Sequence, residues 1–235
     1  DLVAVRGRPV PEIDHQEAPA AAVEGGKDGV HAPGRQAGRC LYGSERTCTS
    51  GRYGEKEVAS WIADGQAPIC FALGSIPSES PSALYERITT ACAEIGERAL
   101  ICSGGTDLSA APQSHEVKVV RAMNYGRIFP MCRAIAHNGG SGTTAASLRA
   151  GVPQLVLWSL HDQPWWGAVV QRFKVGTTRR LTATTQESLV ADLRQILTVD
   201  CARQARDVGA RMHTPAESVM GAADVVESFM FHRST

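Results

Sequence analysis

The chain has 235 residues, of which 43% are apolar and 20% are charged, and its 24 basic side chains equal its 24 acidic ones. This balance is typical of a folded protein and excludes a chain that is disordered overall. A net charge of zero gives no long-range attraction to nucleic acid or to an anionic membrane, so we expect no nucleic-acid partner and at most peripheral membrane contact. The apolar runs are far shorter than the roughly 18 residues of a membrane-spanning helix.

The seven cysteines form no Cys-x-x-Cys pair and have no histidine at zinc spacing, so we predict no metal site. Several of them lie within apolar runs, which predicts reduced thiols in the core. The sequence given also starts without the basic stretch and apolar core of a secretory signal. We therefore expect a cytoplasmic protein.

Residues 1–52 differ in composition from the rest. They hold eight glycines, four prolines and one aromatic residue, Tyr42, and no stretch sustains a helical or strand period. Such a segment has little apolar surface to bury, and ordering its backbone costs entropy. We expect an irregular tail or remnant over 1–52 and one folded domain over 53–235.

Within the expected domain, short apolar runs alternate with helical patterns. The expected strands are 69–73, 99–102, 117–120, 134–136 and 154–158. The expected helices are 81–95, 143–150, 163–173, 186–197, 201–212 and 215–231. Short connections of this kind require parallel pairing with helices on both faces, so the fold class is α/β, a doubly wound, Rossmann-like parallel sheet. Ligands of such sheets bind at the carboxyl ends of the strands.

The stretch from His137 to Thr144 lies between an expected strand and an expected helix. Its three glycines let the backbone turn close to a ligand, and the first amides of the helix remain unpaired. The helix dipole favours an anion there, and Ser141, Thr143 and the His137 ring offer further donors. The stretch predicts a phosphate site, although a plain turn without a ligand stays open on the glycines alone.

The neighbouring residues Asp162 and Gln163 form a second candidate site. A carboxylate that only accepts hydrogen bonds lies beside an amide that donates and accepts, and such pairs recognise adjacent sugar hydroxyls. Asp162 is also well placed to cap the following helix. The two roles are compatible, so both stay open.

Three stretches in this order, 133–144, 148–153 and 162–166, resemble the donor-binding signature of one enzyme group. It comprises the nucleotide-sugar-dependent glycosyltransferases of the bacterial antibiotic and glycolipid type and the sterol glucosyltransferases. The resemblance runs from about residue 68 to 229 and implies the carboxyl-terminal, donor-binding half of a GT-B glycosyltransferase. It further implies a UDP- or TDP-sugar donor, no cofactor, and inverting transfer to a hydroxyl of a lipid or natural-product acceptor.

The resemblance also assigns a donor site. His137 matches the histidine that contacts the diphosphate, and Asn138 stands where the family has a second histidine. Asp162 and Gln163 match the pair that contacts the sugar. The rest of the turn matches at Gly139, Gly140, Ser141, Gly142 and Thr143, with Ser141 in place of the usual alanine.

Two further loops complete this expected site. Gly74 and Ser75 resemble the short loop whose serine meets the distal phosphate. Ala122 and Met123 occupy the position where the family reads the base through backbone groups and a flanking apolar side chain.

Members of this family carry the acceptor site and the general base in an amino-terminal domain. Residues 1–52 are too few to build one. His15 lacks a preceding strand and a glycine loop, so we assign no catalytic residue. We expect a truncated chain that is weakly active or inactive alone, with a missing acceptor domain as a partner. A nucleotide-sugar-binding module that catalyses nothing is the alternative.

Overall fold

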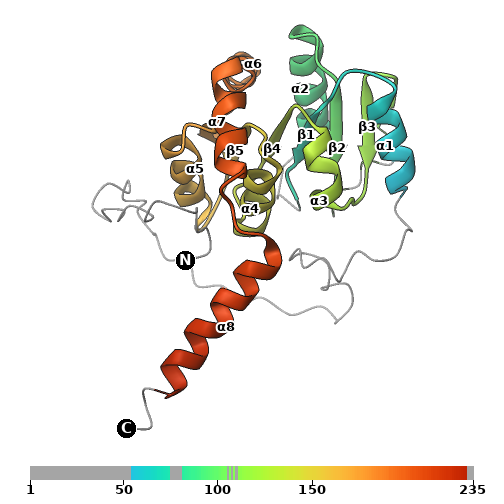
Figure 1. Ribbon diagram of the computed structural model, residues 1–235. Helices are drawn as coiled ribbons and strands as arrows, with labels where there is room; N and C mark the ends of the chain where they lie inside the picture. The colour runs from blue at the N-terminus through green and yellow to red at the C-terminus, as the bar shows by residue number, and fades with distance from the viewer. Residues whose placement is uncertain (1–53, 75–80, 105, 107, 109–110, 232–235) are drawn as a thin grey trace, which may run out of the picture.

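The computed structural model describes residues 54–74, 81–104, 106, 108 and 111–231, most of which build one layered α/β unit (Figure 1). Its central sheet contains six strands within this part of the chain, all paired in parallel, in the order β3-β2-β1-β4-β5-β6. The doubly wound, Rossmann-like sheet predicted from the sequence is therefore confirmed. The strands are β1 (Ile69–Ala72), β2 (Ala99–Cys102), β3 (Val117–Val120), β4 (Ala134–His137), β5 (Gln154–Trp158) and β6 (Gly176–Arg180).

Helices cover both faces of the sheet. The core clusters place α2 and α6 on one face and α1, α3, α4, α5 and α7 on the other. Two short 3-10 turns follow α3 and β6. The helices are α1 (Glu55–Ala63), α2 (Pro81–Glu94), α3 (Tyr125–Ile128), α4 (Ser141–Ala150), α5 (Gln163–Arg172), α6 (Gln186–Ile196), α7 (Val199–Gly209) and α8 (Pro215–Phe231).

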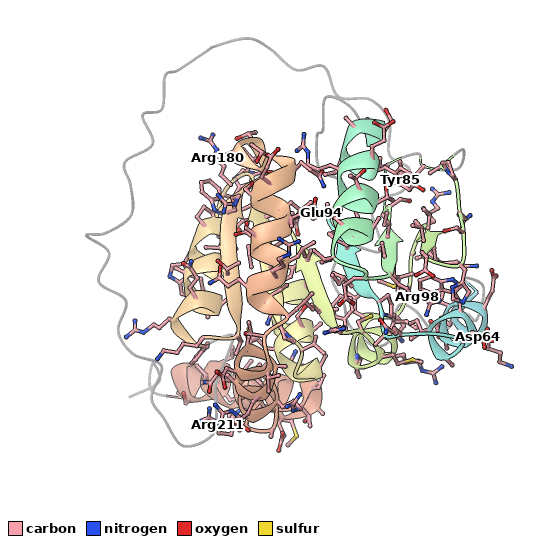
Figure 2. All side chains as sticks on the ribbon, turned by 90° about the horizontal axis from the view of Figure 1, so that it is seen from above. Asp64, Tyr85, Glu94, Arg98, Arg180 and Arg211 are labelled. Carbon is pink, nitrogen blue, oxygen red and sulfur yellow. The ribbon has the colours of Figure 1, made fainter. Side chains whose placement is uncertain are left out.

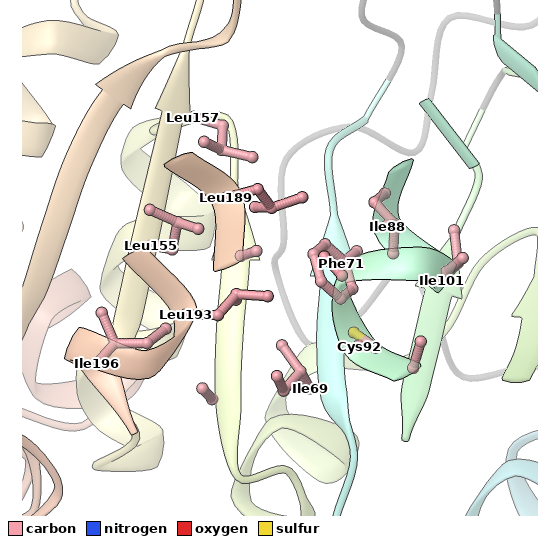
Figure 3. Close-up of a cluster of buried hydrophobic side chains, with 14 of the residues drawn as sticks. Ile69, Phe71, Ile88, Cys92, Ile101, Leu155, Leu157, Leu189, Leu193 and Ile196 are labelled. Atoms are coloured by element: carbon pink, nitrogen blue, oxygen red, sulfur yellow. The ribbon is translucent and has the colours of Figure 1, made fainter. Parts of the chain in front are cut away.

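The core follows from the alternation of side chains along the buried strands. Ile69 and Phe71 of β1 face α2 and α6, where Leu193 of α6 packs on the same cluster (Figure 3). Cys70 and Ala72 point to the opposite face, under α1 and α3. Because both faces of β1 are buried, its sequence is continuously apolar, as is typical of a central parallel strand.

The strand order reverses between β1 and β4, which are hydrogen-bonded neighbours. The chain winds outward from this line in both directions, so the connections after β1 and β4 leave to opposite faces of the sheet. In doubly wound sheets the crevice at such a reversal, at the carboxyl ends of the strands, is the usual ligand site. Gly74, which follows β1, and Asn138, which follows β4, lie at this position.

Arg98 attaches α1 to the sheet (Figure 2). Its buried guanidinium donates hydrogen bonds to the backbone oxygens of Trp61, Ile62, Gln66 and His115, at 2.7 to 3.3 Å. It also stacks on the Trp61 ring at 3.7 Å from the centroid. The planar guanidinium of one arginine therefore provides hydrogen-bond donors for the backbone carbonyls at the end of α1 and in the loop before β1.

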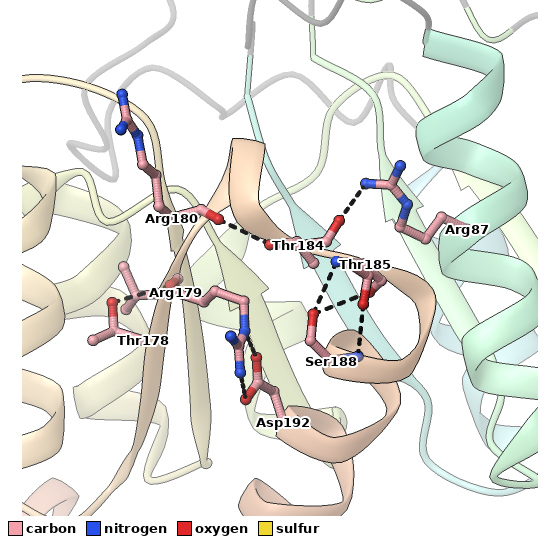
Figure 4. A network of polar contacts seen from close by, with 9 residues as sticks. Arg87, Thr178, Arg179, Arg180, Thr184, Thr185, Ser188 and Asp192 are labelled. Atoms are coloured by element: carbon pink, nitrogen blue, oxygen red, sulfur yellow. Dashed lines mark hydrogen bonds and ion pairs between the residues drawn. The ribbon is translucent and has the colours of Figure 1, made fainter.

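Two α-helices and one strand were not expected from the sequence, namely α1, α3 and β6. The sequence of β6, Gly-Thr-Thr-Arg-Arg, has no apolar run, and an edge strand that is largely half-exposed does not require one. A two-bond ion pair attaches it to α6, from Arg179 Nε and Nη2 to the buried Asp192 carboxylate at 2.5 and 2.9 Å (Figure 4). The bond to Asp192 raises the pKa of Arg179.

The last helix, α8, extends away from the layered unit (Figure 1). Its side chains from Ala216 to Ser228 are mostly exposed, among them the apolar Val219, Met220 and Val226. Within the described ranges, no helix has both the length and the apolar composition needed to cross a bilayer. The expected tail over 1–52 lies outside the described residues.

Candidate functional site

The loops at the carboxyl ends of the strands form one continuous rim. The Gly104 amide donates to Arg121 O at 3.0 Å, which joins the loops after β2 and β3. A Cβ on Gly104 would lie 3.3 Å from the Gly74 carbonyl carbon, and one on Gly74 would lie 3.7 Å from Asn138 Nδ2. The loops after β1, β2, β3 and β4 are therefore in direct succession, as the strand order requires.

The glycine turn after β4 packs directly against the start of α5. Gly139 has a φ of +83°, and a Cβ there would lie 2.8 Å from Val156 Cγ1 and 3.0 Å from Gln163 O. A side chain at this position would be strained and would clash, so the turn requires glycine. This close approach brings the glycine loop beside the Asp162–Gln163 pair.

The amino terminus of α4 has no side-chain cap. Gly140 is its N-cap residue, and the first amide bonded back to Gly140 O is that of Thr144, at 2.9 Å. The amides of Ser141, Gly142 and Thr143 therefore have no partner within the helix. By contrast, α6 and α7 each begin at a threonine whose hydroxyl accepts from the helix. The end of α4 offers free amides, a positive dipole and two half-buried hydroxyls to an anion.

The His137 ring points into the protein. It is 0% exposed, its Nδ1 accepts from the Gly139 amide at 3.0 Å, and its Nε2 lies 2.9 Å from Gln154 Oε1. Burial lowers the pKa of His137 to about 4, so the ring is neutral near pH 7. The sequence suggested a ring that donates to a diphosphate, whereas in this arrangement both ring nitrogens are bonded inside the protein.

Asp162 is exposed at the rim, and one of its carboxylate oxygens is occupied. Trp166 Nε1 donates to Asp162 Oδ2 at 2.9 Å, and no side-chain cap bond to α5 is present. The buried Trp166 ring forms a T-shaped pair with the Trp165 ring at a centroid distance of 4.5 Å. In place of the capping bond considered for Asp162, a bond to Trp166 holds the carboxylate, and the residue stays exposed.

Gln163 is fixed in a similar way. Its Oε1 accepts from the Ser159 and Leu160 amides at 2.8 and 3.1 Å, which closes the loop between β5 and α5. Its Nε2 donates to none of the described residues. Within the described part of the chain, Asp162 Oδ1 and Gln163 Nε2 therefore have no partner, so the pair offers one acceptor and one donor on side chains that are already held.

The two expected base contacts differ in exposure. Met123 is 7% exposed and packs with Ile128 and Phe129, whereas Ala122 is half-buried. Tyr125 stacks on Phe129 at 4.4 Å between centroids and belongs to the same cluster. The Met123 side chain therefore packs in the core and holds the loop in place. The groups of this loop that can contact a base are its backbone and Ala122. The expected contact at Ser75 lies outside the described residues.

One residue of the site was missed in the sequence analysis. Gln154 is fully buried at the amino end of β5, and its side chain lies against the His137 ring beneath the rim. The signal was a lone amide side chain at the start of an otherwise apolar strand, Gln154–Trp158. Among the described residues, no group of three or more histidines, cysteines or acidic residues is placed to hold a metal ion.

Comparisons with known proteins identify the family. Residues 89–229 match the model of the erythromycin biosynthesis protein CIII-like, C-terminal domain. An uncharacterized glycosyltransferase of Mycobacterium tuberculosis is 48% identical over 203 residues, which is 85% of this chain and 49% of the relative. The O-mycaminosyltylonolide 6-deoxyallosyltransferase of Streptomyces fradiae is 34% identical over 146 residues, 60% of this chain and 33% of the relative.

The solved structures agree with this assignment at the level of the fold. The glycosyltransferase VinC, solved in complex with DTDP, superposes with a TM-score of 0.55 at 20% identity and covers 72% of this chain and 44% of its own. The chain spans about half the length of the M. tuberculosis relative. It belongs to the erythromycin biosynthesis protein CIII-like glycosyltransferases and carries their carboxyl-terminal domain, the donor half of a GT-B fold.

Proposed function

We propose that this chain binds the UDP- or TDP-sugar donor for inverting glycosyl transfer to a hydroxyl of a lipid or natural-product acceptor. The observation that carries the proposal is the uncapped amino terminus of α4, placed at the reversal of strand order beside Asp162 and Gln163. The names of the S. fradiae relative and of the VinC complex support a deoxysugar transfer and a thymidine diphosphate site in related proteins.

In this proposal the diphosphate lies over the first turn of α4. The amides of Ser141, Gly142 and Thr143 and the hydroxyls of Ser141 and Thr143 bind its oxygens, and the helix dipole offsets part of its charge. The free Asp162 Oδ1 accepts from a sugar hydroxyl while Gln163 Nε2 donates to one. The backbone around Ala122, in the loop after β3, contacts the base of the nucleotide.

The reaction follows from the placement of these groups. An acceptor hydroxyl attacks the anomeric carbon from the face opposite the diphosphate, and the bond from that carbon to the diphosphate oxygen breaks. The α4 amides stabilise the charge that develops on the leaving diphosphate. A base must remove the hydroxyl proton, and we propose that it comes from an acceptor domain outside residues 53–235. Five described cysteines are free, four of them buried, which supports a cytoplasmic location.

Calorimetric titration of the chain with UDP, TDP and ADP tests the proposal. We expect UDP or TDP to bind, ADP to bind more weakly, and the corresponding sugar nucleotide to gain affinity from the Asp162–Gln163 pair. Asp162→Asn replaces an acceptor oxygen with a donor, so it should weaken sugar-nucleotide binding about 10-fold, the equivalent of one charged hydrogen bond.

The free diphosphate provides the control for this variant. Asp162→Asn should leave UDP or TDP binding within about 2-fold, because the carboxylate faces the sugar and not the phosphates. Failure of every nucleoside diphosphate to bind would refute the proposed function. An equal loss for nucleotide and sugar nucleotide would refute the role given to Asp162.

A further inference from the structure

His137 and Gln154 form a polar pair inside an apolar layer of the domain. Both residues are 0% exposed, and their bond joins the last residue of β4 to the first of β5. Gln154 Nε2 is buried and has no partner among the described residues. A buried donor without a partner destabilises the fold, so an apolar residue would suit this position better unless the amide oxygen is needed.

The bonds on the two ring nitrogens fix the position of the proton. The Gly139 amide points its hydrogen at Nδ1, so Nδ1 must present a lone pair. The proton of the neutral ring therefore resides on Nε2, which donates to Gln154 Oε1. Rotating the Gln154 amide by half a turn would place its NH2 group against this N–H, so the same bond also orients Gln154.

We propose that Gln154 is a positioning residue of the donor site, which acts by holding His137 in the Nε2–H tautomer. In this tautomer Nδ1 accepts the Gly139 amide and draws the glycine turn inward, against Val156 and Gln163. The position of the glycine turn then sets the direction of α4, so that its first amides face the diphosphate. The His137 ring is a brace for the phosphate site and does not itself bind phosphate. This inference rests on the proposed function.

The packing of the turn makes such a brace effective. There is no space for a side chain at Gly139, because a Cβ there would lie within 3.0 Å of both Val156 Cγ1 and Gln163 O. In the other tautomer Nδ1 would carry hydrogen and oppose the Gly139 amide, and the turn could relax only by moving away from the ring. The same movement would shift Gly140, the N-cap residue of α4.

The tautomer is directly observable by long-range 1H–15N NMR of the 15N-labelled chain, with the His137 signals assigned by their loss in His137→Asn. We expect a neutral ring with a lone pair on Nδ1 and hydrogen on Nε2, unchanged when UDP or TDP is added. Gln154→Met keeps the length of the side chain but removes the acceptor oxygen. In this variant the Nδ1–H tautomer should appear. Gln154→Leu serves as a second variant should the methionine chain not fold.

Affinity provides the second readout. Gln154→Met should weaken binding of UDP or TDP about 5-fold, as expected for a displaced hydrogen-bonding group at the phosphates. The matched control is Thr177→Val, a buried polar residue of β6 that pairs with Leu155 and faces the other side of the sheet. Thr177→Val should leave the tautomer unchanged and the affinity within about 2-fold.

Three results would overturn the inference. They are a protonated or Nδ1–H ring in the ligand-free chain, a ring whose Nε2 signal shifts on addition of the nucleotide because it donates to phosphate, and a Gln154→Met chain with wild-type tautomer and affinity. The ligand-free spectrum separates this test from that of the proposed function. If no nucleotide binds, the proposed function fails, and with it the positioning role, while the spectrum still decides whether Gln154 locks the ring.

Discussion

His137 and Asp162 were both expected to contact a ligand, and both form hydrogen bonds within the protein. His137 uses both ring nitrogens, on Gly139 and Gln154, and Asp162 uses one carboxylate oxygen on Trp166. The Asp162 side chain, which faces the proposed sugar, is thus held before a ligand arrives and loses little rotational freedom on binding, while His137 holds the turn beneath the phosphate site. The rim is therefore a pre-organised surface.

The burial of His137 makes stability depend on pH. The pKa of the ring is about 4 in the folded chain and about 6.5 in an unfolded one, so the unfolded state binds more protons between these values. The ring's contribution to stability is complete above about pH 6.5 and is lost as the pH falls toward 4, with a slope of up to about 1.4 kcal/mol per pH unit. Urea unfolding at a series of pH values measures this slope.

The variant His137→Gln isolates the contribution of this ring from that of other titrating groups. It removes one titrating group, so the slope of unfolding free energy against pH between pH 6.5 and 4 should fall by up to about 1.4 kcal/mol per pH unit, the equivalent of one proton. Identical slopes for the two chains would show that the ring titrates normally and that its burial is not maintained in solution.

At the level of elements, the glycine turn and the first turn of α4 contain two glycines that differ in the space available for a side chain. Gly139 has a positive φ and no space for a side chain. Gly142 lies in the first turn of the helix, and nothing lies within 4 Å of the position of its Cβ. The two positions therefore form a matched pair within one loop.

Gly139→Ala should destabilise the domain by about 2 to 4 kcal/mol, because backbone strain and overpacking add. Gly142→Ala should be neutral or stabilising by up to about 1 kcal/mol, since alanine favours the helix. Thermal unfolding followed by circular dichroism measures both. A Gly139→Ala chain as stable as the Gly142→Ala chain would show that the turn is not held against β5 and α5.

The comparison of elements also shows where sequence reasoning succeeds. Strands β1, β2, β4 and β5 are buried on both faces and therefore appear as apolar runs in the sequence. By contrast, the edge strand β6 has the sequence Gly-Thr-Thr-Arg-Arg and carries no such signal, whereas the other edge strand, β3, keeps three valines and could be predicted. In the site, the glycine turn could be predicted from local sequence. The direction of the His137 ring could not, because its partner Gln154 is 17 residues away and becomes a neighbour only through strand pairing.

At the level of the whole molecule, the chain corresponds to about half of its M. tuberculosis relative. Transfer requires a donor site, an acceptor site and a base that converge on one carbon atom. The described residues supply candidates for the first of these. The activity of the chain alone is therefore a sensitive test of where the other groups lie.

We expect the chain alone to transfer sugar to sterol or macrolide hydroxyls at a rate close to background. A general base contributes typically about 10² to 10⁴-fold, and positioning of the acceptor contributes more. Incubation with a labelled sugar nucleotide and chromatography of the acceptor measure the rate. Rapid turnover would contradict this account and would direct attention to residues 1–53, where His15 is a candidate base.

Helix α8 has a consequence for how the chain unfolds. Its 17 residues are attached at one end, where Arg149 bonds to His213 O and Ser218 Oγ, and most of the helix lies away from the core. Isolated helices of this length are only marginally stable in water, because nucleation is costly and no packing offsets it. The amide hydrogens of α8 should therefore exchange with solvent by local fraying, while those of the central strands await global unfolding. The free energy for opening α8 is thus separate from that for unfolding the layered unit, and a single melting temperature describes only the layered unit.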